Sequence, residues 1–80
     1  MNGGRLSNDE TFLLGVAELR TQLQSAAPDG EAAQRALARI AVRYPEEAEH
    51  LGELWSGPQA QACAALLARV EAQHQAENED

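Results

Sequence analysis

Apolar residues recur along the chain at the three- and four-residue spacing of one face of an α-helix. In the first segment, Phe12, Val16, Leu19 and Leu23 are separated by four, three and four positions. At about 100° per residue, this spacing places their side chains in one narrow stripe. Later stripes consist of Ala33, Leu37, Ile40 and Tyr44; of Ala48, Leu51 and Trp55; and of Cys63, Leu66, Leu67, Val70 and His74. The pattern predicts an all-α chain of three to four short helices, and no segment shows the alternation of a strand.

Capping residues and prolines indicate where these helices begin and end. Ser7 and Glu10 form the S-x-x-E pattern of a capping box, so the first helix should begin at Ser7. An Ala-Pro-Asp-Gly turn follows it, in which Asp29 is the expected cap of the second helix. Pro45 should end the second helix near Tyr44 and open the third. A Ser-Gly-Pro break then precedes the fourth.

The length of the chain allows one helical domain. Its 80 residues are enough for one domain and too few for two. The short turns favour a compact bundle over residues 1–80. We expect the glycine-rich residues 1–7 and the polar residues 75–80 to be disordered.

The composition predicts a thin core. Phe12, Tyr44 and Trp55 are the only aromatic residues. A single core of this size rarely supplies more than about 3–5 kcal/mol, and short natural chains often add a disulfide, a metal or a partner. Cys63 is the only cysteine, so an intramolecular disulfide is excluded. We therefore expect a homodimer or larger homo-oligomer, or folding against a partner.

Charge and hydropathy narrow the class of partner and the compartment. The net charge is −7 and all six cations are arginines. A generic DNA or RNA binder would need a basic face to displace counterions, so nucleic acid is a disfavoured partner. The chain has neither a membrane-length apolar run nor a secretory leader, and it has a lone thiol, which together predict a cytoplasmic protein with no membrane contact. Abundant alanine and arginine without lysine suggest a bacterial or phage source.

Few residues could act as metal ligands or as catalytic nucleophiles. His50, Cys63 and His74 are the only soft metal ligands, and no pair of them has the i, i+4 or C-x-x-C spacing of a shared ion. A nucleophilic site would need Cys63 or a serine beside a histidine and a third orienting group. The three serines all fall at expected caps or turns. We therefore predict no enzymatic activity, no metal site and no cofactor.

Two charged rows follow the outer faces of the second and third predicted helices. They consist of Arg35, Arg39 and Arg43, and of Glu46, Glu49 and Glu53. The arginines could contact phosphate or an acidic partner. The glutamates could imitate a line of phosphates or meet a basic partner. Alternatively, the rows pair with each other, within one subunit or between two, or are simply solvated.

Apolar residues outside the stripes are the other interface candidates. Leu14, Val42 and Leu54 point away from the stripes of their own helices. Trp55, beside a Gly-Pro turn, is either a core anchor or an interface hot spot. A second protein surface would cover these side chains.

Together these features favour a small non-enzymatic interaction module: a regulator, adaptor or inhibitor that docks a helix face on a larger protein. Two alternatives stay open. One is an acidic nucleic-acid mimic, carried by a phage or plasmid, that inhibits a bacterial defence complex. The other is a small transcriptional regulator, with the arginine row as its phosphate contact.

Overall fold

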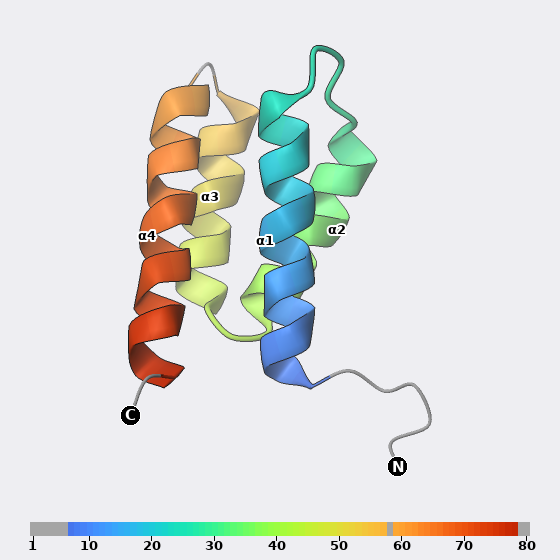
Figure 1. Cartoon of the computed structure of the whole chain (residues 1–80). Helices are drawn as coiled ribbons and strands as arrows, with labels where there is room; N and C mark the ends of the chain where they lie inside the picture. Colours follow the sequence, from blue (N-terminus) through green and yellow to red (C-terminus); the bar gives the residue numbers. More distant parts are fainter. Residues whose placement is uncertain (1–6, 58, 79–80) are drawn as a thin grey trace.

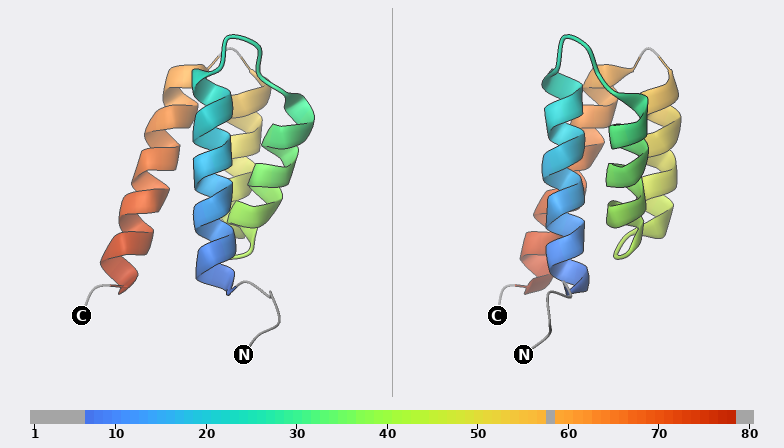
Figure 2. Two further views of the ribbon diagram at one scale, coloured as in Figure 1. Left: turned by 45° about the vertical axis from the view of Figure 1, so that its right-hand side comes forward. Right: turned by 90° about the vertical axis from the view of Figure 1, so that its right-hand side faces the viewer.

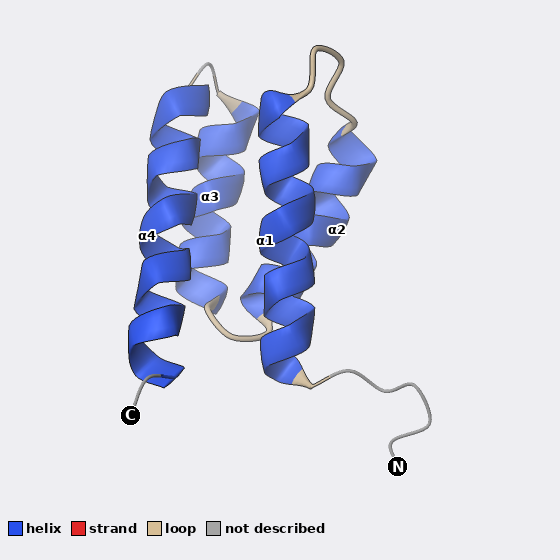
Figure 3. Ribbon diagram, in the orientation of Figure 1, coloured by secondary structure: helices blue, strands red, loops and turns tan. Residues whose placement is uncertain are grey.

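The computed structural model describes residues 7–57 and 59–78, and within these ranges the chain is helical with no strand (Figures 1 and 3). The described residues form α1 (Asn8–Gln24), α2 (Gly30–Ala41), α3 (Pro45–Ser56) and α4 (Ala60–Asn78). The prediction of a small all-α bundle is therefore confirmed.

The four helices run alternately up and down, and each packs against the next one in sequence (Figure 2). α4 also packs against α1, which closes the bundle. As a result, the start of α1, the α2–α3 turn and the end of α4 meet at one end of the molecule. The most extensive contact is between α1 and α2.

The predicted caps are present. The Ser7 hydroxyl accepts a hydrogen bond from the Glu10 amide, and the Glu10 carboxylate accepts one from the Ser7 amide, both at 3.1 Å. At the start of α2, the Asp29 carboxylate accepts from the Glu31 amide at 3.0 Å. α2 ends at Ala41, slightly before the predicted end near Tyr44, although the Tyr44 amide still donates to the Ile40 carbonyl at 2.9 Å. Tyr44 itself, which precedes Pro45, is outside the helical region, with φ −134° and ψ 73°.

α4 extends further than the sequence predicted. The expectation that residues 75–80 are disordered is wrong for residues 75–78, which belong to the helix. Two side chains there have partners: Glu77 accepts from the Tyr44 hydroxyl, and Asn78 donates to the His74 carbonyl. Ser7 is likewise ordered, as the cap of α1. The rest of the two predicted disordered ends, residues 1–6 and 79–80, lies outside the described residues.

The predicted stripes form the core. Nearly all of their residues are buried, including Phe12, Leu19, Ile40, Leu51 and Leu67. Leu23, Leu66 and Trp55 are only partly buried and pack against this cluster. His74 closes the stripe of α4 with only 5% of its surface exposed.

Gly15 explains how α1 and α2 approach so closely. It is buried in the middle of α1. A Cβ atom at this position would lie 2.7 Å from the Ala36 carbonyl oxygen and 2.8 Å from the Arg39 Cβ. Both distances are below van der Waals contact, so only glycine fits without moving the helices apart.

Candidate functional site

The arginine row of α2 is largely occupied by contacts within the chain. Arg39 pairs with Glu18 of α1 at 3.2 Å. Arg43 lies between carboxylates of Asp9 and Glu77, at 3.1 and 3.3 Å. Arg35 is exposed and has no ion pair with a described residue. Two of the three predicted contact residues therefore tie α2 and the turn after it to neighbouring helices.

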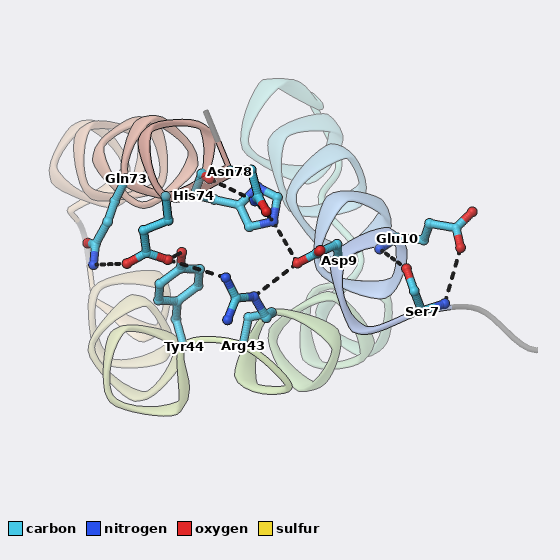
Figure 4. A network of polar contacts seen from close by, with 9 residues as sticks. Ser7, Asp9, Glu10, Arg43, Tyr44, Gln73, His74 and Asn78 are labelled. Atoms are coloured by element: carbon cyan, nitrogen blue, oxygen red, sulfur yellow. Dashed lines mark hydrogen bonds and ion pairs between the residues drawn. The ribbon is translucent and has the colours of Figure 1, made fainter. Parts of the chain in front are cut away.

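Arg43 belongs to a polar cluster at the end of the bundle where α1 begins and α4 ends (Figure 4). Nε2 of His74 lies 3.0 Å from the Asp9 carboxylate, and the Tyr44 hydroxyl donates to Glu77 at 2.6 Å. Nε of Arg43 lies 3.1 Å from the same Asp9 oxygen but is not aligned to donate a hydrogen bond, so this contact is an ion pair.

Hydrogen bonds and burial shift the pKa values of three groups in this cluster. The hydrogen bond with His74 lowers the pKa of Asp9, and the hydrogen bond with Tyr44 lowers the pKa of Glu77. Burial, together with the Glu77 carboxylate, raises the pKa of Tyr44 to about 12. Tyr44 is therefore a hydrogen-bond donor at neutral pH. The Phe12 ring lies 5.1 Å from the Tyr44 ring and 4.6 Å from the His74 ring, so the cluster rests directly on the core.

The acidic row lies elsewhere, on the exposed side of α3. Glu46, Glu49 and Glu53 are all exposed, and no ion pair joins any of them to a described residue. The predicted possibility that this row pairs with the arginines of α2 in one subunit is therefore not realised in the described part of the chain. Arg39 and Arg43 contact α1 and α4, while Glu49 and Glu53 border the space between α2 and α3.

That space is a shallow, open groove of about 790 Å³ along α2 and α3. Its floor consists of Leu37, Ala38, Ala41, Ala48 and Gly52. Glu49 and Glu53 form its edge on α3, and Gln34 lies on the α2 side. The groove thus combines an apolar floor with one strongly acidic edge.

Gly52 is the unusual residue of this floor. A glycine inside a helix costs about 1 kcal/mol relative to alanine. Unlike Gly15, Gly52 has room for a side chain: an added Cβ would meet only Leu37 Cδ1, at an ordinary contact distance of 3.6 Å. The packing of the described chain therefore does not require glycine here. Periodicity shows where such a glycine lies on its helix, but not whether a neighbouring helix fills the space beside it.

The predicted apolar outliers divide into two groups. Leu14 and Val42 are exposed, at 47% and 45%, and Leu13, which the sequence interpretation overlooked, is 44% exposed. Leu54 and Trp55 instead pack against the core and are partly buried. Leu54 therefore does not point fully outward, because its own chain covers part of it.

The lone cysteine lies in the core of the bundle. Cys63 is buried, and burial raises the pKa of its thiol, which donates to the Leu51 carbonyl at 3.7 Å. Across the described ranges, no group of three His, Cys, Asp or Glu side chains is placed to hold a metal ion. None of the helices described is both long and apolar enough to cross a membrane.

The residues themselves therefore carry the functional argument: no protein-family model, no curated protein and no solved structure matches this chain.

Proposed function

We propose that this chain is a small, non-enzymatic protein–protein interaction module that docks on a larger protein through the faces of α2 and α3. The observation that carries the proposal is the open groove between these helices. Its floor is apolar, and its edge residues Glu49 and Glu53 have no ion-pair partner among the described residues. A partner surface would bury the floor and neutralise the edge.

The polar cluster at the end of the bundle supports this role by fixing the two helices. Arg43 and Tyr44 follow α2 and precede α3, and both contact Glu77 of α4. The turn that sets the spacing of the groove is thereby held in place. A preorganised surface binds with a smaller entropic cost than a mobile one.

The alternative functions use less of this geometry. A nucleic-acid mimic would use the row Glu46, Glu49 and Glu53, which is exposed as a mimic requires, but it would have no use for an apolar floor. A transcriptional regulator would need the arginine row, and Arg39 and Arg43 already contact carboxylates. A mimic would bind its target with strong salt dependence, whereas an apolar contact is less sensitive to salt.

We also propose that two copies associate through α1, and that the protein acts in the cytoplasm. Leu13 and Leu14 are exposed on α1, beside the exposed Ala17 one helical turn further on. A second copy would cover both leucines. The single, free and buried thiol of Cys63 is in keeping with a reducing compartment.

Site-specific photo-crosslinking tests the proposed docking. A photoreactive phenylalanine analogue replaces Ala38, an exposed residue on the groove floor, or, as the matched control, Ala65, an exposed residue of α4. The full chain is then irradiated in an extract of the source cells. We expect a discrete protein adduct from position 38 and none from position 65. Equal adducts from both positions, or none from either, would contradict the proposal.

A further inference from the structure

Apart from Leu37, the floor of the α2–α3 groove consists of alanine and glycine residues. Ala38, Ala41 and Ala48 line the groove together with Gly52, and a Cβ atom added at Gly52 would make only an ordinary contact, 3.6 Å from Leu37 Cδ1. Glycine and alanine permit the backbone of another element to approach closely. The floor therefore allows the backbone of a bound partner segment to lie close to α2 and α3.

The apolar surface also continues beyond the floor. Val42 follows Ala38 by four residues, so the two side chains are neighbours on the same face, and Val42 is 45% exposed. Pro45 is exposed as well and lines the groove. Together they extend the apolar strip to the turn between α2 and α3.

The length and walls of the groove fit a helix. Its lining extends along α3 from Pro45 to Ser56, a rise of about 16 Å, or roughly three helical turns. The walls are themselves two helices, and the described residues form no sheet edge to which a strand could be added. An amphipathic helix in such a groove is a common mode of recognition, with its contact residues at i, i+3, i+4 and i+7.

The charge along the edge of the groove determines which kind of helix can bind there. Glu49 and Glu53 lie on one edge, and Glu46 precedes them by one turn on the same helix. The opposite side carries the neutral Gln34. In a two-fold contact between two copies across this groove, the acidic edges of the copies would both enter the interface and repel. The edge is complementary to a basic partner and unfavourable for a second copy.

We infer that the α2–α3 groove binds a basic amphipathic α-helix of a partner protein. The apolar face of that helix lies on the floor at Gly52 and Ala38, and its arginine or lysine side chains reach Glu49 and Glu53. This inference rests on the proposed function and specifies the chemistry of the partner.

Two synthetic peptides test it against the full chain. Each has about fourteen residues with the same alanine–leucine face, enough for three to four helical turns. One carries arginines beside that face and the other glutamates. Fluorescence anisotropy gives the affinities, and amide chemical shifts of the labelled protein give the surface contacted. We expect the arginine peptide to bind at least about tenfold more tightly than the glutamate peptide and to shift amides of α2 and α3.

Variants separate the steric part of the inference from the electrostatic part. Gly52→Leu fills the floor and should weaken binding of the arginine peptide at least about tenfold. The control Ala65→Leu adds bulk to an exposed position of α4 and should leave binding unchanged. Glu49→Gln combined with Glu53→Gln should weaken binding and reduce its dependence on salt. Circular dichroism of each variant verifies that it is folded.

Several outcomes would overturn the inference. The two peptides could bind equally, or the chemical-shift changes could centre on α1 instead of the groove. A folded Gly52→Leu variant could bind as tightly as the parent. The arginine peptide could also fail to bind up to about 1 mM, the weak end of specific association. If the arginine peptide fails while position 38 still crosslinks to a cellular protein, the inference falls and the proposed function stands. If both experiments fail, both fall.

Discussion

Nε2 of His74 lies 3.0 Å from Oδ1 of Asp9, although the two residues are 65 positions apart in the chain. This contact joins the first turn of α1 to the end of α4. The ionised Asp9 carboxylate can only accept, so this hydrogen bond uses a proton on Nε2 of His74. Nδ2 of Asn78, which lies 3.1 Å from the same Nε2, then donates to the His74 carbonyl at 2.9 Å instead. One end of the bundle is therefore closed by ionisable groups that rest on Phe12, and its stability should respond to pH.

We expect the protein to lose stability in acid through Asp9 and Glu77. The pKa of each carboxyl lies below its ordinary value, 3.8 for Asp9 and 4.5 for Glu77, because each accepts a hydrogen bond in the folded state. The unfolded chain therefore binds protons first as the pH falls. The stabilisation is present above these ordinary values and is lost as the pH falls through the lower pKa values of the folded state.

Urea unfolding midpoints measured from neutral pH down to about pH 3 test this expectation. Asp9→Asn should lower the midpoint at neutral pH and flatten its decline in acid, because the titrating group is gone. The control is Glu46→Gln, which removes a carboxylate on the exposed side of α3. Glu10 is unsuitable as a control because it caps α1. An Asp9→Asn variant whose midpoint declines as steeply as that of the parent would contradict the role of this carboxylate.

Tyr44 provides the corresponding test in alkali. Its pKa is raised from 10.0 to about 12 by burial and by the Glu77 carboxylate. The folded state therefore holds the proton more tightly than the unfolded state. Its contribution to stability is fully present below pH 10.0 and is lost as the pH rises toward about 12. Tyr44 is the only tyrosine, so the near-ultraviolet absorbance of tyrosinate reports this group alone.

Glu77→Gln should lower the midpoint of that titration, because it removes the negative charge that the tyrosinate would face. The chain contains no lysine, so no lysine deprotonation overlaps the transition. A parent midpoint close to 10.0 would mean that the hydroxyl is exposed and that the contact with Glu77 does not form in solution.

The sequence predicted the parts of this structure that depend on local spacing. The stripes were recoverable because each one is defined on a single helix, and the caps at Ser7 and Asp29 because capping is satisfied within three residues. The cluster of Asp9, Arg43 and His74 could not be predicted in this way, because it joins three segments whose proximity follows from the arrangement of the helices. Only the position of His74 at the end of a buried stripe pointed toward it.

The same limit explains why neighbouring helices cover some of the residues expected on outer faces. Periodicity places a residue relative to the stripe of its own helix, but it does not show which neighbour covers the flank. Leu54 lies off the stripe of α3, yet it packs against the core. Arg39 lies on an outer face of α2, yet α1 supplies Glu18 beside it. For the same reason, the groove could not be predicted without knowing that α2 and α3 lie side by side.

The two interior glycines should respond to alanine in opposite directions. Gly52→Ala should raise the free energy of unfolding by up to about 1 kcal/mol, because alanine is the better helix former and the added methyl makes only an ordinary contact. Gly15→Ala should lower it by about 1–3 kcal/mol, because the methyl would be forced against the Ala36 carbonyl. Thermal and urea melts of the two variants compare them directly. Destabilisation of similar size at both positions would show that Gly52 is needed by the fold after all.

Self-association through α1 should respond to salt in the opposite sense to groove binding. Leu14 is 47% exposed, so it can enter a two-fold contact without leaving the monomer core. Two copies each carry a net charge of −7 and repel, and added salt screens that repulsion while leaving the apolar contact intact. We therefore expect sedimentation equilibrium to show a dimer that strengthens as salt is added, whereas binding of a basic helix in the groove weakens.

Leu14→Glu should abolish the dimer and leave helix content unchanged, because this position lies outside the core. Ala65→Glu is the matched control, since it adds the same charge to an exposed position of α4. If both variants weaken association equally, general repulsion is the cause and α1 is not the contact. If the parent stays at the monomer mass at high concentration and high salt, with a cooperative melt, the helical bundle is sufficient alone and the exposed leucines serve some other contact.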